Sequence, residues 1–235
     1  MQADIEILRR LGCHPATVVT ALTAQDTVDV QAVYPQAAAD FQAQARLLMA
    51  DLPIKAIKIG LLGSVQIAEA VADCIDAAGG VPVVLDPILA AGGGHALAGE
   101  RVMQAVIRLL LPRATVVTPN TVEASRLTGR STPDDCAAAL QAMGCPHVVL
   151  TGTHEEGADV VNRWYGPNAM EATSWPRLPE SYHGSGCTLA AAVAGGLALG
   201  WPLVEAVAVA QRLTWESLRD GYAVGRGQRL PRRTG

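Results

Sequence analysis

The sequence predicts an α/β fold in which helices cover both faces of a mostly parallel sheet. Strand-like and helix-like segments alternate along the 235 residues, as they do where crossover helices connect parallel strands. The strand-like segments are apolar throughout, which is typical of strands buried on both faces. Hydrophobic residues make up 50% of the chain and aromatic residues only 4%, so Ala, Val and Leu must fill the core. We expect a single domain that spans residues 1–235.

The order of the elements follows from these patterns. The expected buried strands are 16–22, 56–61, 81–85, 115–118 and 147–150. Segments 160–165 and 170–175 flank a Gly-Pro-Asn turn and are expected to form a hairpin at one edge of the sheet. The expected helices are 40–49, 64–78, 100–111, 133–143, 188–199 and 203–218, with Ser64 and Thr132 as N-caps. Residues 1–8 also indicate the start of a helix, although an α/β domain more often opens with a strand.

Charge and cysteine content limit the partners and the compartment. The net charge is -4 and the pI about 5.7, so we expect no face for nucleic acid or for a membrane. The terminal arginines are expected to form a solvated tail; they are Arg226, Arg229, Arg232 and Arg233. Five cysteines without a Cys-x-x-Cys pair, and no signal peptide before the first helix, predict a reduced cytoplasmic protein. The apolar segment 188–199 is too short to span a bilayer.

The most informative segment is His-Gly-Ser-Gly-Cys-Thr at residues 183–188, which an apolar helix follows directly. Gly184 and Gly186 allow unusual backbone dihedral angles and a close approach to a ligand. Free N–H groups and the positive end of a helix would then converge on one point, which suits a phosphate. The same field is expected to lower the pKa of Cys187, so that its thiolate would serve as a base toward a hydroxyl group. The alternative is a glycine-rich turn in which Cys187 only packs.

A second segment, Thr-Pro-Asn-Thr-Val-Glu at residues 118–123, follows a predicted strand. Asn120 and Glu123 are three residues apart, so at the start of a helix they share one face. An amide and a carboxylate there would hold water molecules around Mg²⁺. The alternative is a capping box in which Asn120 is the N-cap and Glu123 the third helical residue.

Asp86 lies at the carboxyl end of another predicted strand, where open α/β sheets bind their ligands. It would face Mg²⁺ or phosphate there, or else cap the following turn. Glycines 92–94 follow and form either a flap or a plain loop.

Two further polar residues belong to strand-like segments. Gln25 follows the first predicted strand, and its amide both donates and accepts hydrogen bonds, as the edge of a heterocycle requires. A surface glutamine is the alternative. Lys58 lies inside an apolar strand, where a lysine needs a partner, and we favour a structural ion pair over a ligand role.

Together these segments resemble the ribokinase superfamily, and within it the hydroxymethylpyrimidine/phosphomethylpyrimidine kinases of thiamin biosynthesis. The matching blocks occur in the same order along nearly the whole chain and are residues 2–4, 20–25, 58–60, 85–87, 118–123, 184–188 and 225–228. In most of the superfamily the last loop residue is Asp. A cysteine there, as at Cys187, is similar to the pyrimidine kinases and to a related group of pyridoxal kinases.

The resemblance implies a ribokinase-like fold and a reaction. A kinase of this kind phosphorylates 4-amino-5-hydroxymethyl-2-methylpyrimidine, and then its monophosphate, with Mg–ATP, and it is usually a homodimer. Cys187 would be the base, and Gly184, Ser185, Gly186 and Cys187 would form the anion hole. Asp86 and Glu123 would serve the metal. The nucleotide would contact Asn120, Glu123, Thr151, Gly152 and His183. The pyrimidine would contact Gln25 and Gly60.

The sequence departs from the family in two places. The family begins with a strand and a Ser/Gly-rich loop that contributes to the substrate pocket, and this sequence lacks them, so we expect a late start or a shortened and poorly active chain. The family also has a lysine before the glycine near the nucleotide, whereas Thr151 precedes Gly152 here. Rival interpretations are a pyridoxal or pyridoxine kinase and a non-catalytic ligand-binding relative.

Overall fold

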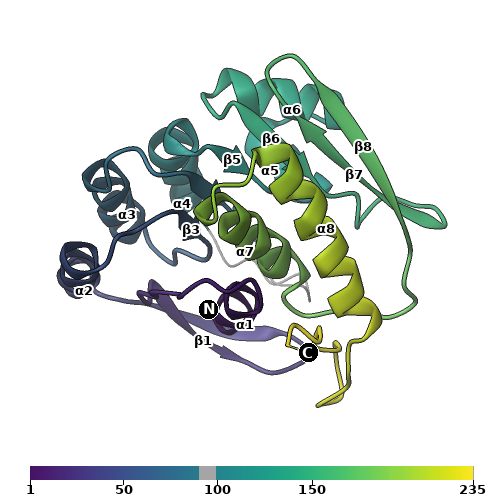
Figure 1. The fold of residues 1–235 in the computed structure, drawn as a ribbon, viewed down its shortest axis with the longest axis horizontal. Coiled ribbons are helices and arrows are strands. Elements are labelled where there is room, and N and C mark those ends of the chain that lie inside the picture. Colours follow the sequence, from purple (N-terminus) through teal and green to yellow (C-terminus); the bar gives the residue numbers. More distant parts are fainter. Residues whose placement is uncertain (90–98, 235) are drawn as a thin grey trace.

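A computed structural model describes residues 1–89 and 99–234 of the chain. Its central sheet has six strands in the order β3-β4-β5-β6-β7-β8 (Figure 1). Four parallel strands come first and are β3 (Ile57–Ile59), β4 (Val83–Leu85), β5 (Val116–Val117) and β6 (His147–Leu150). The antiparallel hairpin of β7 (Asp159–Tyr165) and β8 (Met170–Pro176) completes one edge. The predicted sheet and its edge hairpin are therefore confirmed.

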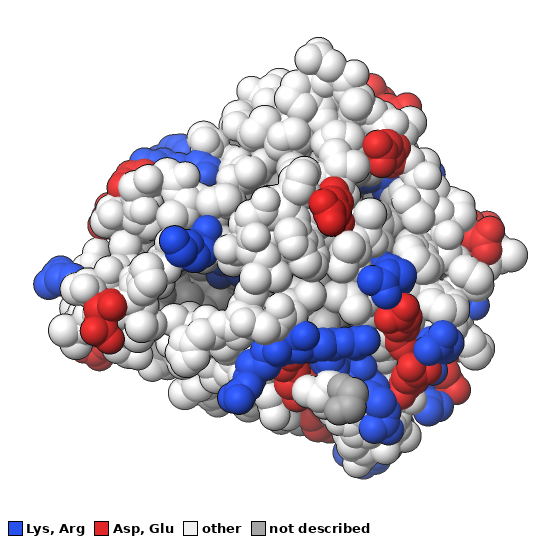
Figure 2. All heavy atoms as spheres, in the orientation of Figure 1, with Lys and Arg blue, Asp and Glu red and all other residues white. Residues whose placement is uncertain are grey.

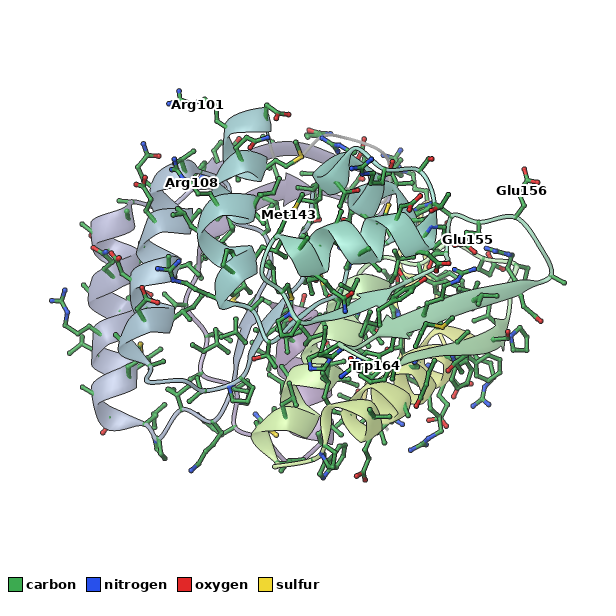
Figure 3. The ribbon with its side chains drawn as sticks, turned by 90° about the horizontal axis from the view of Figure 1, so that it is seen from above. Arg101, Arg108, Met143, Glu155, Glu156 and Trp164 are labelled. Carbon is green, nitrogen blue, oxygen red and sulfur yellow. The ribbon has the colours of Figure 1, made fainter. Side chains whose placement is uncertain are left out.

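Helices cover both faces of this sheet, as predicted. One face carries α1 (Gln2–Arg10), α7 (Ser185–Ala198) and α8 (Leu203–Arg219). The other carries α2 (Ala38–Asp51), α3 (Val65–Ala77), α4 (Glu100–Ala105), α5 (Thr121–Thr128) and α6 (Pro133–Ala142). Seen from above, the strands lie between a layer of teal helices and a layer of yellow-green ones (Figure 3).

The inner strands β4, β5 and β6 are almost wholly apolar because each contributes side chains to both cores. Val83 and Leu85 of β4 belong to the core beneath α3, whereas Val84 between them packs with α7. In β6, Val148 and Leu150 face one core and Val149 the other. Alternate side chains of a strand point to opposite faces, so a sheet covered on both sides needs an apolar residue at every position.

The prediction for the first strand was wrong. Residues 16–22 do not join the central sheet; instead β1 (Ala21–Gln25) pairs with β2 (Val30–Pro35) in a separate two-stranded antiparallel sheet. The turn between them forms because the Asp26 carboxylate accepts hydrogen bonds from the N–H groups of Val28 and Asp29, at 2.8 and 3.0 Å.

Two helix boundaries also differ from the prediction. The helix expected over 100–111 is α-helical only to Ala105 and then continues as a π-helical segment (Val106–Leu110) and a 3-10 turn (Leu111–Arg113). Pro112 lacks the N–H that a regular continuation needs. Helix α7 begins three residues early, at Ser185, because Gly184 takes a left-handed conformation as its N-cap. The glycines at 92–94 lie outside the described residues.

The terminal arginines do not form a free tail. The backbone of Arg229 bonds to Ser181 and His183, and the Arg233 side chain is only 6% exposed. Basic side chains do gather over the C-terminal end of the molecule in Figure 2, but acidic ones lie beside them. Arg219, for example, pairs with Asp220 at 2.8 Å. In the described part of the chain, no helix combines the length and the apolar character that crossing a membrane requires.

Candidate active site

The candidate site lies where the parallel strands end. Asp86 directly follows β4, and its N–H donates to the Ile59 carbonyl oxygen of β3 at 2.9 Å. Asn120 follows β5 and forms a parallel bridge with Thr151, which follows β6. The carboxyl ends of neighbouring strands therefore bring these predicted residues to one edge of the sheet, where open α/β sheets bind ligands.

The glycine loop meets this edge. Gly184 has φ of 78°, a value that favours glycine, and starts α7. Within the described chain, the N–H groups of Ser185, Gly186 and Cys187 find no acceptor, so they are free to bind an anion. A side chain at Gly186 would lie 4.0 Å from Asp86 Oδ1, which shows how close the loop comes to β4. The predicted anion-binding geometry is thus present, and residues 184–187 are called the anion loop below.

A buried lysine connects the first helix to the strand ends beside the anion loop. Lys58 Nζ lies 3.0 Å from Asp4 Oδ1 and 3.4 Å from Asp86 Oδ2, and its side chain is 9% exposed. Burial alone lowers the pKa of Lys58, but the neighbouring Cys187, Asp86 and Asp4 raise it well above its usual value. Gly60 leaves room for this ammonium group, because a Cβ there would lie 3.0 Å from Nζ. The predicted structural ion pair is confirmed, with two carboxylates instead of one.

The pKa of Cys187 moves in the direction opposite to the prediction. Burial raises the pKa of this thiol to about 12; Lys58 lowers it, and Asp86 and Asp4 raise it again. The side chain keeps some solvent exposure, but the packed charges around it replace much of its hydration. Lost hydration and the two carboxylates raise the pKa more than the ammonium groups of Lys58 and the N-terminus, together with the helix end, lower it. The resting group is therefore a thiol, and it lies close enough to Asp86 for the charge of that carboxylate to raise its pKa.

Asn120 and Glu123 form the capping box that was the alternative to a metal site. Asn120 Oδ1 accepts from the Glu123 N–H at 2.9 Å, and Glu123 Oε2 accepts from the Asn120 N–H at 3.0 Å. Burial raises the pKa of Glu123 to about 7; the Asn120 hydrogen bond opposes this shift, and the Asp86 charge adds to it. The capping hydrogen bond uses Oε2 of Glu123.

Asp86 and Glu123 fit a hard cation. Both are buried, and they are near enough for the Asp86 charge to raise the pKa of Glu123. Asp86 Oδ2 accepts no well-aligned hydrogen bond among the described residues, although Lys58 lies beside it. In the same part of the chain, no group of three or more His, Cys, Asp and Glu side chains could hold a metal. Mg²⁺ needs only one or two carboxylates when phosphates and water complete its shell.

The other predicted residues divide between this edge and its surroundings. Gly152 is required for packing, because a Cβ there would overlap the Val161 carbonyl oxygen. The His183 N–H donates to the Arg229 carbonyl oxygen at 2.9 Å, and burial lowers the pKa of its ring. Gln25 is exposed at the end of β1, and among the described residues no hydrogen bond or ion pair joins it to Lys58, Asp86 or Cys187.

Sequence reasoning missed two residues at this site. Asp4 belongs to a block that matches the resembled family, yet no role was assigned to it. A charged lysine inside an apolar strand was a signal that a carboxylate had to lie nearby. Arg233, which reaches the anion loop, carried no signal, since it lies in an arginine cluster at the end of the chain.

Comparisons of sequence point to one family. The family described as phosphomethylpyrimidine kinase matches residues 1–231. A hydroxymethylpyrimidine/phosphomethylpyrimidine kinase of Rhizobium meliloti is 36% identical, over 97% of this chain and 89% of the relative. The kinase of the same name from Streptomyces coelicolor is 35% identical, over 97% and 86%. A thiamine biosynthesis bifunctional protein of Geobacter sulfurreducens is 35% identical, and the aligned part is 48% of that protein.

Comparisons of structure confirm the ribokinase-like fold. A Bacillus subtilis pyridoxal kinase in complex with ADP has a TM-score of 0.91 and 28% identity, over 99% of this chain and 91% of that one. A Staphylococcus aureus pyridoxal kinase with AMP-PCP and pyridoxal has a TM-score of 0.90 and 26% identity, over 99% and 87%. A phosphomethylpyrimidine kinase from Clostridium difficile has a TM-score of 0.79 and 29% identity, over 90% and 89%.

Proposed function

The chain belongs to the phosphomethylpyrimidine kinase family, and from this premise we propose that it transfers the γ-phosphate of ATP to 4-amino-5-hydroxymethyl-2-methylpyrimidine and then to the monophosphate. The observation that carries the proposal is the anion loop with Cys187 at its end, beside Asp86 and Lys58. This set supplies the positioning and charge neutralisation on which phosphoryl transfer depends.

In the first step the substrate hydroxyl oxygen attacks the γ-phosphorus, and the bond from phosphorus to the ADP oxygen breaks. The N–H groups of Ser185, Gly186 and Cys187 would hold the phosphoryl oxygens during the transfer, when negative charge is shared with the attacking and the leaving oxygen. The thiolate of Cys187 would accept the hydroxyl proton. The second step needs a base less, because a phosphate oxygen is already ionised.

The raised pKa of Cys187 has an explanation in this scheme. Asp86 and Asp4 disfavour the thiolate while their charges are only partly offset by Lys58. A cation held by Asp86 and Glu123 would neutralise the phosphates and offset the same carboxylate charge. The base would therefore form chiefly when the nucleotide and its metal are in place.

The proposal includes further expectations that rest on the family resemblance. They are Mg²⁺ as the metal, Asn120 and Thr151 at the nucleotide, a single domain, a homodimer and a cytoplasmic location. Thr151, in place of the usual lysine, lies beside Asn120 and keeps a polar group at that position.

A second candidate function is the phosphorylation of pyridoxal. The pyridoxal kinase structures from Bacillus subtilis and Staphylococcus aureus have TM-scores of 0.91 and 0.90, higher than the 0.79 of the Clostridium difficile phosphomethylpyrimidine kinase. The sequence relatives from Rhizobium meliloti and Streptomyces coelicolor, in contrast, carry the pyrimidine kinase name at 36% and 35% identity.

A comparison of the two alcohols as phosphate acceptors separates these functions. The protein is incubated with Mg–ATP and either the hydroxymethylpyrimidine or pyridoxal, and the phosphorylated product is quantified by mass spectrometry. We expect a higher kcat/KM for the pyrimidine. A preference for pyridoxal would replace the first function by the second. If neither alcohol were phosphorylated, the remaining interpretation would be a ligand-binding relative.

A further inference from the structure

We propose that Arg233, close to the end of the chain, is a positioning residue that holds the anion loop in its phosphate-binding conformation. The proposal rests on the proposed function, since it names what keeps that loop in place. Arg233 lies two residues beyond the end of the family match, which stops at residue 231. Its guanidinium group is buried and contacts the loop directly.

The backbone before Arg233 is tied down along its length. Residues 228–233, the C-terminal strap, run beside the segment that leads into the anion loop. The Arg229 N–H donates to the Ser181 carbonyl oxygen, and the Arg229 carbonyl oxygen accepts from the His183 N–H, both at 2.9 Å. The Arg232 N–H donates to the Ser217 carbonyl oxygen of α8 at 2.8 Å. These bonds deliver the next side chain to one fixed place.

The guanidinium group of Arg233 then joins three segments of the chain. Nε donates to Thr188 Oγ1 at 2.7 Å, and Nη2 donates to the carbonyl oxygens of His183 and Gly184 at 3.3 and 3.4 Å. Nη1 pairs with Glu6 Oε2 of α1 at 3.1 Å. A planar group with five donors suits this task, because a lysine could not reach all of these acceptors at once.

These contacts converge on the residue that sets the loop geometry. The Gly184 carbonyl oxygen also accepts from the Thr188 N–H at 3.0 Å and from Thr188 Oγ1 at 2.8 Å. A side chain at Gly184 would meet Arg233 Nη2 at 2.9 Å, so glycine is needed there for space as well as for its positive φ. Arg233 and Thr188 together fix the peptide after which the free N–H groups begin.

A positioning role predicts a defined kinetic pattern. Arg233→Ala leaves the residues at the nucleotide edge, Asn120 and Thr151, unchanged, so the KM for ATP should stay within about threefold. The kcat should fall by about 10- to 100-fold, because displaced donors stabilise the transferring phosphoryl group less well. Arg232→Ala is the matched control: its side chain is exposed and lies outside the loop, and this variant should keep the wild-type kcat.

The decisive test is binding of Mg–ADP with and without aluminium fluoride, which mimics the transferring phosphoryl group. Fluoride should tighten ADP binding to the wild type and to Arg232→Ala, and this gain should be at least about tenfold smaller in Arg233→Ala. If fluoride tightens ADP binding to Arg233→Ala as much as to the wild type, the positioning role of Arg233 is overturned and the proposed function is not. No gain in the wild type overturns the proposed anion loop, and the inference with it. If Arg233→Ala does not fold, the same binding measurement is made with Arg233→Lys, which keeps the positive charge but loses the planar set of donors.

Discussion

Cys187 is a thiol at rest, because burial and the charges of Asp86 and Asp4 outweigh the opposing charges of Lys58 and the N-terminus. With its pKa raised to about 12, only a small fraction is ionised near neutral pH, and that fraction grows about tenfold per pH unit. We therefore expect kcat/KM for the alcohol substrate to keep rising from pH 7 to pH 9. The pH profile of initial rates at low alcohol concentration measures this.

The monophosphate substrate is the internal control for this pH profile. Its phosphate ionises with a second pKa near 6, so its kcat/KM should be almost flat over the same range. Cys187→Ser should also lose the slope for the alcohol. A plateau for the alcohol at pH 7 in the wild type would mean that the thiolate is already formed when Mg–ATP is bound, and would contradict a pKa that stays raised in that complex.

Glu123 predicts a pH dependence of metal binding. Its pKa rises from the usual 4.5 to about 7, so folding favours the protonated form. The stability that this carboxyl contributes is complete below about pH 4.5 and is lost as the pH rises through about 7. A cation requires the carboxylate, so Mg²⁺-dependent ADP binding should strengthen between pH 6 and pH 8.

Glu123→Gln provides the comparison for the metal. The glutamine carbonyl keeps the hydrogen bond from the Asn120 N–H, so the helix cap survives, but the titrating group is gone. ADP titrations at several Mg²⁺ concentrations should then show weaker binding with little change between pH 6 and pH 8. If ADP binding to this variant kept the wild-type pH dependence, a group other than Glu123 would be responsible for that dependence.

Most residues that the structure brings together at this edge of the sheet had been named from the sequence, but their electrostatics had not been predicted. Gly184, Asp86 and Asn120 follow strands or begin helices, and such positions can be recognised from local patterns. The pKa of Cys187 depends instead on Asp4, far away in the chain, and on how much water the fold excludes. Local sequence shows neither the position of Asp4 nor the exclusion of water, so the prediction of a lowered pKa for Cys187 was wrong.

At the scale of elements, the two-stranded sheet of β1 and β2 is the part that differs most from the prediction. It packs next to the segment after β3, where a side chain at Gly63 would meet Ala21 and Pro35 at 3.1 and 3.2 Å. The sheet thus borders the carboxyl ends of the strands, and Gln25 lies at its end (Figure 1).

Gln25 tests whether this small sheet takes part in substrate recognition. An aminopyrimidine presents an amino donor beside a ring-nitrogen acceptor, and one carboxamide answers both, whereas pyridoxal has no such pair. Gln25→Leu should lower kcat/KM for the hydroxymethylpyrimidine by about 10- to 100-fold and affect pyridoxal much less. Both substrates are measured with both proteins. Equal losses for the two substrates would show that Gln25 does not discriminate between them.

The central elements were predictable because one pattern determines them. Segment 147–150 is apolar at three successive positions, and β6 has these bounds in the structure. Segment 30–35 was missed, because β2 belongs to a sheet outside the two cores and includes exposed residues such as Tyr34. The edge hairpin of β7 and β8 was recognised from its turn. The loop before it, between β6 and β7, is held by side chains and could not be recognised in this way. There Glu155 pairs with Arg163 at 2.7 Å, and Glu156 points outward (Figure 3).

At the scale of the whole molecule, Lys58 joins the first helix to the sheet. It pairs with Asp4 of α1 and with Asp86 after β4, so three parts of the chain depend on one buried ammonium. Lys58→Met should lower the free energy of unfolding by about 3–5 kcal/mol, because the buried Asp86 carboxylate loses its counter-ion and Asp4 keeps only the N-terminal ammonium. Urea denaturation at pH 7 measures this.

Two comparisons make the test of Lys58 specific. Adding Asp4→Asn to Lys58→Met removes one uncompensated charge and should restore part of the stability. Arg219→Met breaks an exposed ion pair with Asp220 and should leave the urea midpoint unchanged. A stable Lys58→Met protein would contradict the view that this cluster holds α1 on the sheet.

Phosphorus NMR follows the two phosphorylations separately in wild type and in Cys187→Ala, with Mg–ATP and the hydroxymethylpyrimidine, and so tests whether Cys187 is the base. The account predicts that the wild type forms the monophosphate and then the diphosphate. Cys187→Ala should form the monophosphate about 10²- to 10⁴-fold more slowly, the range for losing a general base. Given the monophosphate directly, it should still produce the diphosphate. An undiminished first step in Cys187→Ala, or no phosphorylated pyrimidine from the wild type, would contradict the account.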